Sequence, residues 1–204
     1  LLGRPLAAVS EGLESWLNGM TGSSMIVLGV VLGLMMCFDL GGPVNKAAYT
    51  FATAGLVADN PATLRIMAAV MAAGMVPPLA MGLATVVRRR LFSPAEQENG
   101  RAAFLLGASF ITEGAIPFAA ADPLRVIPSM MAGGAVTGAL IMAFSVESYA
   151  PHGGVFVVFA INPVWGYLLA ILVGTLVACA AVVAAKSARR DPAPTTAGAE
   201  PVAA

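Results

Sequence analysis

The sequence is poor in charge: only 11% of its 204 residues are Asp, Glu, Lys or Arg, whereas soluble domains carry roughly a quarter. Hydrophobic residues make up 58% of the chain and the mean hydropathy is +0.84, which excludes a soluble globular domain. Eleven basic residues balance eleven acidic ones, and no basic run exceeds three residues. The chain therefore lacks the basic surface that a nucleic-acid partner would require.

Cysteine and histidine are also scarce, with two cysteines and one histidine in the whole sequence. Cys37 and Cys179 both lie in apolar runs, where we expect them to pack as small hydrophobic side chains rather than form a disulfide or bind a metal. We accordingly expect no metal site and no cofactor.

Long uncharged runs dominate what remains. The hydrocarbon core of a bilayer is about 30 Å thick and needs about 20 helical residues to cross it. Runs at residues 23–38, 66–87, 126–146 and 164–185 predict about four spanning helices, and hence an all-α, polytopic membrane protein. Because the sequence opens on Leu1 and carries charges soon afterwards, we expect no signal peptide and interpret the chain as a fragment.

The segments around the runs predict three parts. Residues 1–22 place apolar side chains on one helical face, which fits an interfacial amphipathic helix and equally a linker helix from an upstream domain. Residues 23–185 form the membrane part. Residues 186–204 are rich in Pro, Ala and Thr and predict a disordered tail. Arg88 and its two following arginines, together with Lys186, predict the cytoplasmic face.

Two apolar segments are interrupted. Residues 39–46 contain two glycines and Pro43, which break a helix and free backbone groups for other partners. Residues 102–121 contain Glu113, and an ionisable residue at membrane depth is a functional candidate because burying it in lipid is costly. Arg88 and Lys186 can both lie on the cytoplasmic side if residues 102–121 enter the membrane from the cytoplasm and return there. The run 155–161 would then dip into the membrane without crossing it.

Both interrupted segments resemble one family. The stretches FDLGGPVNKAAYTF at residues 38–51 and ITEGAIPFAAADPLR at residues 111–125 resemble the fructose-type enzyme IIC of the bacterial phosphoenolpyruvate-dependent sugar phosphotransferase system. PHGG at residues 151–154 is similar to that family as well. The resemblance covers about residues 6–185 and corresponds to the C-terminal, sugar-binding part of a complete enzyme IIC.

The resemblance implies a multi-pass permease of the bacterial inner membrane, dimeric as a full-length protein. It would bind fructose and present it to the phosphocysteine of an enzyme IIB partner, which makes it the membrane component of a fructose phosphotransferase. Neither Cys37 nor Cys179 has the exposed, electropositive setting that a phosphoacceptor thiolate requires. The phosphoryl donor is therefore expected on another domain or chain.

Glu113 is the candidate catalytic residue and also a candidate sugar ligand. A carboxylate accepts charge-assisted hydrogen bonds from sugar hydroxyls and can take the proton of the attacking one. The alternative is a purely structural carboxylate, neutralised by a partner such as Lys46.

Four further residues are candidate sugar ligands. Asn45 can read hydroxyl groups and Lys46 can offset negative charge, or both can satisfy carbonyl groups freed by the helix break. Asp39 binds substrate or only caps the following helix. His152 precedes two glycines that would let the backbone approach a ligand, or it is simply solvated.

Other readings of the sequence remain open. Broken helices and Glu113 suit an ion- or proton-coupled secondary transporter unrelated to phosphotransfer equally well, and a truncated chain would also suit a membrane scaffold without transport activity. The residues themselves do not separate fructose from mannitol-like or mannosyl substrates. Asp122 and Arg125, one helical turn apart, are expected to form a structural ion pair.

Overall fold

The computed structural model describes residues 23–56 and 60–188, and these residues are almost entirely helical. The expected amphipathic helix at 1–22 and most of the expected tail lie outside the described residues. The elements in chain order are α2 (Ser23–Phe38), α3 (Pro43–Ala54), α4 (Pro61–Val87), η1 (Arg89–Leu91), α5 (Pro94–Ala108), η2 (Thr112–Ala115), α6 (Ile116–Ala121), α7 (Pro123–Ala143), β1 (Glu147–Ser148), η3 (Gly154–Ala160), β2 (Ile161–Asn162) and α8 (Val164–Ala188).

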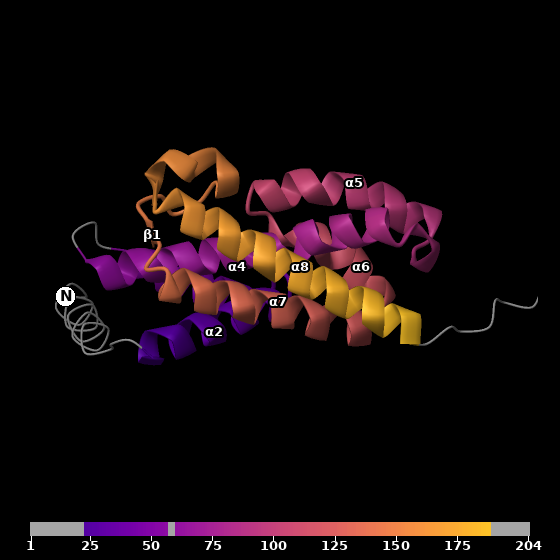
Figure 1. The fold of residues 1–204 in the computed structure, drawn as a ribbon, viewed down its shortest axis with the longest axis horizontal. Helices are drawn as coiled ribbons and strands as arrows, with labels where there is room; N and C mark the ends of the chain where they lie inside the picture. The colour runs from indigo at the N-terminus through magenta and orange to yellow at the C-terminus, as the bar shows by residue number, and fades with distance from the viewer. Residues whose placement is uncertain (1–22, 57–59, 189–204) are drawn as a thin grey trace, which may run out of the picture.

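Three helices, α4, α7 and α8, are long and apolar enough to cross a membrane. They lie side by side along the longest axis of the molecule (Figure 1). This confirms three of the four expected spans as membrane-length helices, whereas α2 has only 16 residues. Helix α4 is the core of the fold, because its apolar side chains are buried over nearly its whole length. Its Asn60 cap accepts a hydrogen bond from the Ala62 amide at 3.0 Å.

Small residues let α7 approach both of its neighbours closely. Gly138 and Gly134 of α7 lie against the backbone of Gly29 and Gly33 of α2, so that a Cβ at any of the four would collide with the facing helix. The order of these pairs shows that α2 and α7 run antiparallel. Such contacts are the usual way for membrane helices to pack without a hydrophobic driving force between them.

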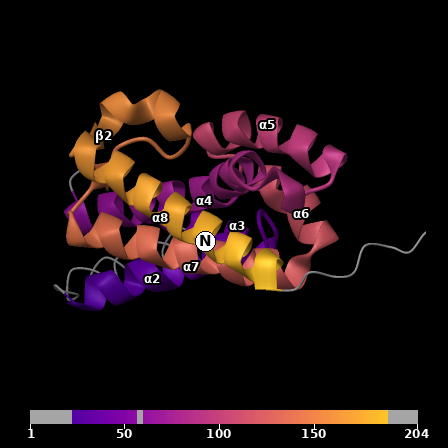
Figure 2. The same ribbon diagram turned by 45° about the vertical axis from the view of Figure 1, so that its right-hand side comes forward.

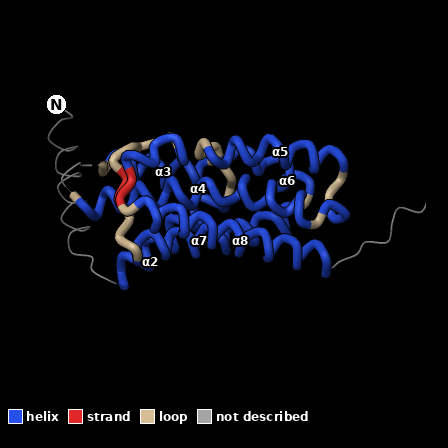
Figure 3. The backbone as a smooth tube through the Cα atoms, turned by 45° about the horizontal axis from the view of Figure 1, so that its top comes forward, coloured by secondary structure: helices blue, strands red, loops and turns tan. Residues whose placement is uncertain are grey.

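Helices α2 and α3 form a hairpin, which we call the first hairpin (residues 23–54). The antiparallel packing on α7 places the start of α2 near β1. Only six residues separate the end of α3 from the start of α4. Near that start, Arg65 of α4 lies 3.4 Å from Glu147 of β1. Both arms therefore open at the same end of the molecule, the β1 end, where the strands lie in Figure 3. Helix α2 enters and α3 returns, instead of α2 crossing.

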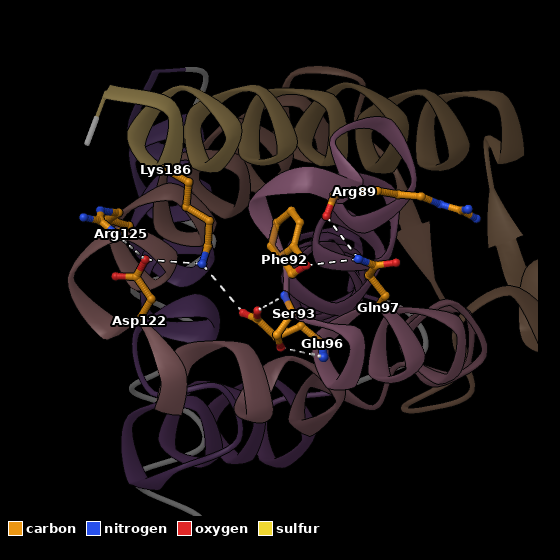
Figure 4. A network of polar contacts seen from close by, with 8 residues as sticks. All are labelled: Arg89, Phe92, Ser93, Glu96, Gln97, Asp122, Arg125 and Lys186. Carbon is orange, nitrogen blue, oxygen red and sulfur yellow. Dashed lines mark hydrogen bonds and ion pairs between the residues drawn. The ribbon is translucent and has the colours of Figure 1, made fainter. Parts of the chain in front are cut away.

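Residues 94–121 form a second hairpin, made of α5, η2 and α6. It opens at the opposite end, the Lys186 end, where Lys186 at the end of α8 lies 3.7 Å from Glu96 of α5 and 3.3 Å from Asp122 after α6 (Figure 4). A crossing segment would have separated Glu96 from Asp122 by the thickness of the membrane. The re-entrant path expected for 102–121 therefore matches the structure.

The Lys186 end has well-defined helix termini. Ser93 and Glu96 form a reciprocal capping box at the start of α5, with the Glu96 carboxylate accepting from the Ser93 amide at 2.7 Å. Helix α8 continues to Ala188, beyond the boundary at residue 185 expected from composition. The Lys186 side chain, 10% exposed, is held by two carboxylates and lies 5.0 Å above the Phe92 ring.

The connection from α7 to α8 stays at the β1 end. Strand β1 pairs antiparallel with β2, with Glu147 opposite Asn162, so the segment between them starts and finishes at one place. The run expected to dip without crossing forms η3 within this excursion. Gly154 lies against the Ala108 carbonyl, which brings η3 beside the end of α5 on the same side of α8 (Figure 2).

Candidate functional site

The tips of the two hairpins meet and, together with His152, line one cavity of about 320 Å³. Lys46, in the first turns of α3, lies 3.5 Å from Glu113 in η2 through Nζ and Oε1. The first hairpin reaches this point from the β1 end and the second from the Lys186 end. The cavity is lined by Asn45, Lys46, Tyr49, Thr50, Phe110, Thr112, Glu113 and His152.

Asp39 holds the first tip together. Its carboxylate oxygens accept hydrogen bonds from the backbone amides of Val44 at 2.6 Å and Asn45 at 2.9 Å, which are donors left free at the start of α3. Its side chain is half-buried and is not among the residues that line the cavity. Asp39 therefore caps the start of α3 and does not line the cavity as a sugar ligand would.

Gly41 allows the two tips to touch. Its φ of +107° is a conformation that residues with a Cβ rarely adopt. A Cβ at this position would lie 2.6 Å from the Glu113 side chain. The close approach of the first tip to Glu113 therefore depends on glycine.

Asn45 combines a structural contact with a place on the cavity wall. Its side-chain amide donates to the Met36 carbonyl at 2.7 Å, one of the acceptors at the end of α2 that the helix break leaves without a continuing helix. The residue is buried, with 6% of its surface exposed. Asn45 is also one of the residues that line the cavity.

Glu113 is positioned by its neighbour rather than by its own contacts. Thr112 is buried and donates its hydroxyl to the Gly74 carbonyl of α4 at 2.8 Å, which anchors η2 on the central helix. The Glu113 side chain remains 46% exposed and Lys46 is 67% exposed. An ion pair with this much solvent contact contributes little to stability, about 0–1 kcal/mol, so both groups are available to a ligand.

Three aromatic rings line the same cavity. The His152 ring lies 4.9 Å from the Phe110 ring and 6.2 Å from the Tyr49 ring, centroid to centroid. Tyr49 and Phe110 are 6.0 Å apart. The cavity thus combines aromatic rings with charged and hydrogen-bonding groups, the combination typical of sites for polar organic ligands.

The structure brings Asn45, Lys46, Glu113 and His152 to one cavity, whereas Asp39 is not among the lining residues and instead caps α3. Sequence reasoning missed Tyr49, Thr50, Phe110 and Thr112 as lining residues. Three of them lie inside the two family-like stretches and Phe110 precedes the second one directly, so an aromatic ring beside a helix break was the available signal.

Potential metal ligands do not gather around this cavity. Across residues 23–56 and 60–188, no group of three or more His, Cys, Asp or Glu side chains is placed to hold a metal ion. Cys37 and Cys179 are free thiols, buried in α2 and α8.

Known proteins that are similar to this chain belong to the phosphotransferase system. Residues 2–133 match the protein family described as "Phosphotransferase system, EIIC". The chain is 58% identical over 181 residues to the fructose-specific EIIB'BC component of Escherichia coli K12, a match covering 87% of this chain and 32% of that protein. It is 49% identical over 173 residues to the fructose-specific EIIABC component of Bacillus subtilis, with 85% and 27% covered.

A third relative is shorter. The chain is 48% identical over 177 residues to the fructose permease IIC component of Bacillus amyloliquefaciens, covering 87% of this chain and 57% of that protein. The chain thus spans about a third of the length of the E. coli relative. No solved structure matches.

Proposed function

This chain belongs to the phosphotransferase system EIIC family, and on that premise we propose that it forms the sugar-binding part of a fructose permease. The observation that carries the proposal is the cavity at the hairpin tips, which brings Lys46 and Glu113 together with Tyr49, Phe110 and His152. A sugar offers hydroxyl groups around its edge and C–H groups on its faces. The charged and hydrogen-bonding groups of the cavity suit the former and its aromatic rings suit the latter.

Glu113 is the proposed general base. A fructose hydroxyl would donate a hydrogen bond to the carboxylate, which takes the proton as the hydroxyl oxygen attacks phosphorus. The phosphorus–sulfur bond to the enzyme IIB cysteine breaks in the same step, and that sulfur leaves as a thiolate. Lys46, 3.5 Å from Glu113, supplies positive charge beside the developing phosphate ester.

Asn45 and His152 are the proposed neutral sugar ligands. The Asn45 amide retains an oxygen that can accept from a hydroxyl while its nitrogen stays on Met36. His152 can accept or donate through its ring nitrogens. Asp39 does not bind the sugar itself in this proposal, since its carboxylate already caps α3. It holds the tip of the first hairpin in the conformation that positions Asn45.

The orientation and the partners belong to the same proposal. Positive charge gathers at the Lys186 end, with Arg88, Arg89 and Arg90 beside Ser187, and the positive-inside tendency makes that end cytoplasmic in a bacterial inner membrane. Phosphorylated enzyme IIB would reach the sugar from that side. The full-length protein would be a dimer. The E. coli relative is named as an EIIB'BC protein, which supports a IIB partner.

Substitution of Glu113 by Gln tests the proposal in a complete transporter that carries this chain. The change keeps size and some hydrogen bonding but removes the base, so partner-dependent sugar phosphorylation should fall by roughly 10²–10⁴-fold. Sugar binding should fall only about tenfold. Abundance in the membrane should be unchanged, since the Lys46–Glu113 pair is largely exposed.

The control is Glu98→Gln, which removes a carboxylate of an exposed pair with Arg101 far from the cavity and should leave all three measurements unaltered. Near-normal phosphorylation by the Glu113 variant would remove this residue from the mechanism. A loss of membrane abundance would instead assign it a structural role. Ion-coupled transport of sugar that persists without enzyme IIB would support the alternative, which the named relatives do not favour.

A further inference from the structure

A second cavity, of about 760 Å³, lies at the Lys186 end of the molecule, where α4 and α8 both terminate. It shares no residue with the sugar cavity and is formed by the last turn of α4, the η1 segment and the last turn of α8. Its lining consists of Val86, Val87, Arg88, Arg89, Arg90, Leu91 and Ser187.

The charge on this cavity is not compensated within the described chain. Arg88, Arg89 and Arg90 are all exposed, and among the described residues no carboxylate forms an ion pair with any of them. The other cations of these residues do have acidic partners: Lys46 with Glu113, Arg65 with Glu147, Arg101 with Glu98, Arg125 with Asp122, and Lys186 with Glu96 and Asp122.

The Arg89 side chain points away from the acidic groups around Lys186 (Figure 4). Figure 4 shows the Arg89 guanidinium directed away from the cluster of Lys186, Asp122 and Glu96, while the Arg89 carbonyl accepts from Gln97 at 3.1 Å. Arg88, Arg89 and Arg90 all line the cavity, and none of them is paired with a carboxylate of the described residues. Each guanidinium group can bind a phosphate in bidentate fashion.

The same cavity is also lined by apolar residues at the end of a membrane-length helix. Helix α4 is buried over most of its length, yet Val86 and Val87 are 56% and 59% exposed. They are the last two residues of this membrane-length helix and are followed at once by the arginines. Apolar surface thus ends where positive charge begins, which is the level at which lipid phosphates meet acyl chains.

We propose that this cavity binds an anionic phospholipid. The guanidinium groups of Arg88, Arg89 and Arg90 bind its phosphate, and the upper part of an acyl chain lies along Val86 and Val87. Basic pockets between membrane helices on the cytoplasmic side are the sites at which acidic lipid headgroups bind. An acidic protein surface would match the charge but not the exposed valines below it, which lie on the hydrocarbon side of the arginines.

Lipid titration of the purified complete transporter, followed by native mass spectrometry, tests this site. The probes are phosphatidylglycerol and phosphatidylcholine with identical acyl chains. In the unaltered protein, phosphatidylglycerol should bind more tightly than phosphatidylcholine. The combined change Arg88→Gln, Arg89→Gln and Arg90→Gln should weaken phosphatidylglycerol binding on the order of 100-fold and leave phosphatidylcholine binding unchanged.

Two further variants separate charge from folding and from a soluble anion. Replacing the three arginines by lysine keeps the charge and should retain most of the preference, while Arg101→Gln, at a paired arginine outside the cavity, should retain all of it. Changing Val86 and Val87 to Ser should weaken phosphatidylglycerol but not inorganic phosphate. Sugar binding, measured for each variant, reports on folding.

Equal phosphatidylglycerol binding by the unaltered and triple-glutamine proteins would overturn the proposal. So would inorganic phosphate binding as tightly as the lipid, which would make this a soluble-anion site. Loss of enzyme IIB binding by the triple-glutamine protein with phosphatidylglycerol binding intact would assign the patch to a protein partner. These outcomes are independent of Glu113 and hence of the proposed phosphotransfer.

Discussion

Asn45 and Lys46 are adjacent in sequence, line the same cavity and have opposite surroundings. Asn45 is buried and donates to the Met36 carbonyl, whereas the Lys46 side chain is 67% exposed and forms an ion pair with a half-exposed carboxylate. The sequence alone is equally consistent with a ligand role and a structural role for each of these two residues. The geometry gives Asn45 a structural contact and leaves Lys46 free for a ligand.

A pair of substitutions should separate these two roles. Asn45→Leu leaves a buried carbonyl without a donor and should lower the free energy of unfolding by about 1–3 kcal/mol. Lys46→Gln should leave stability within about 0.5 kcal/mol of the unaltered protein while reducing sugar phosphorylation. Thermal unfolding in detergent and a IIB-dependent phosphorylation assay measure the two effects. Equal destabilisation by both changes would contradict the division.

The packing of α2 on α7 depends on glycine residues at their contact. The α2–α7 contact places Gly138 against the Gly29 carbonyl, with no room for a side chain. Gly138→Leu should force the helices apart and cost about 1–3 kcal/mol or more. Ala132→Leu adds the same side chain at an exposed position of α7 and should be nearly neutral. The midpoint of thermal unfolding compares them, and equal midpoints would show that α2 is not packed on α7 as described.

The junction between α6 and α7 depends on pH through Asp122. Burial of this carboxyl raises its pKa, but hydrogen bonds and charge from Arg125 at 2.9 Å and Lys186 at 3.3 Å outweigh burial, so that the pKa lies below its usual 3.8. A lowered folded-state pKa stabilises the protein above the unfolded value and loses that stability as the pH falls through the folded value.

The Asp122→Asn variant should therefore differ from the unaltered protein in a pH-dependent way. At pH 7 it should be less stable by about 1–3 kcal/mol, because both cations lose a charge-assisted hydrogen bond. The difference should stay constant down to about pH 5 and shrink below pH 3.8. Unfolding measured between pH 3 and 7 tests this. A difference that grows on acidification would reverse the sign of the argument.

The two hairpins entering from opposite ends define the topology of the whole molecule. If the second hairpin returns to the face it enters from, Glu98→Cys and Leu124→Cys must both be labelled from the side that labels Ser187→Cys. Tyr149→Cys, in the exposed connection at the β1 end, should be labelled only from the other side. A membrane-impermeant maleimide applied to intact cells and to inverted vesicles distinguishes the faces.

The native thiols give little background in this experiment, because Cys37 and Cys179 are buried. Labelling of Leu124→Cys and Glu98→Cys from opposite sides would show that 94–121 crosses the membrane. Labelling of Ser187→Cys from outside intact cells would invert the proposed orientation, and the arginine cavity at that end would then face away from the cytoplasm.

Local chemistry accounts for what the sequence alone predicted well. Uncharged runs predicted α4, α7 and α8, because the bilayer requires that length and polarity. Glycine and proline in residues 39–46 predicted a helix break, because glycine is a poor helix former and proline has no backbone N–H to donate. The charged pair of Asp122 and Arg125 followed from helical spacing, and the structure confirms it at 2.9 Å. Each of these depends on neighbours in the chain.

Contacts between distant segments were decided only by the tertiary structure. Whether residues 23–38 cross or turn back depends on Gly29 and Gly33 packing on α7, and an apolar run of 16 residues looks alike in both cases. His152 joins Tyr49 and Phe110 only because the η3 excursion folds back beside α5. In the sequence, Lys186 is indistinguishable from a solvated lysine at the end of a helix. In the structure it pairs with two carboxylates, Glu96 of α5 and Asp122 after α6. Composition and spacing carry no information about partners a hundred residues away, and packing supplies it.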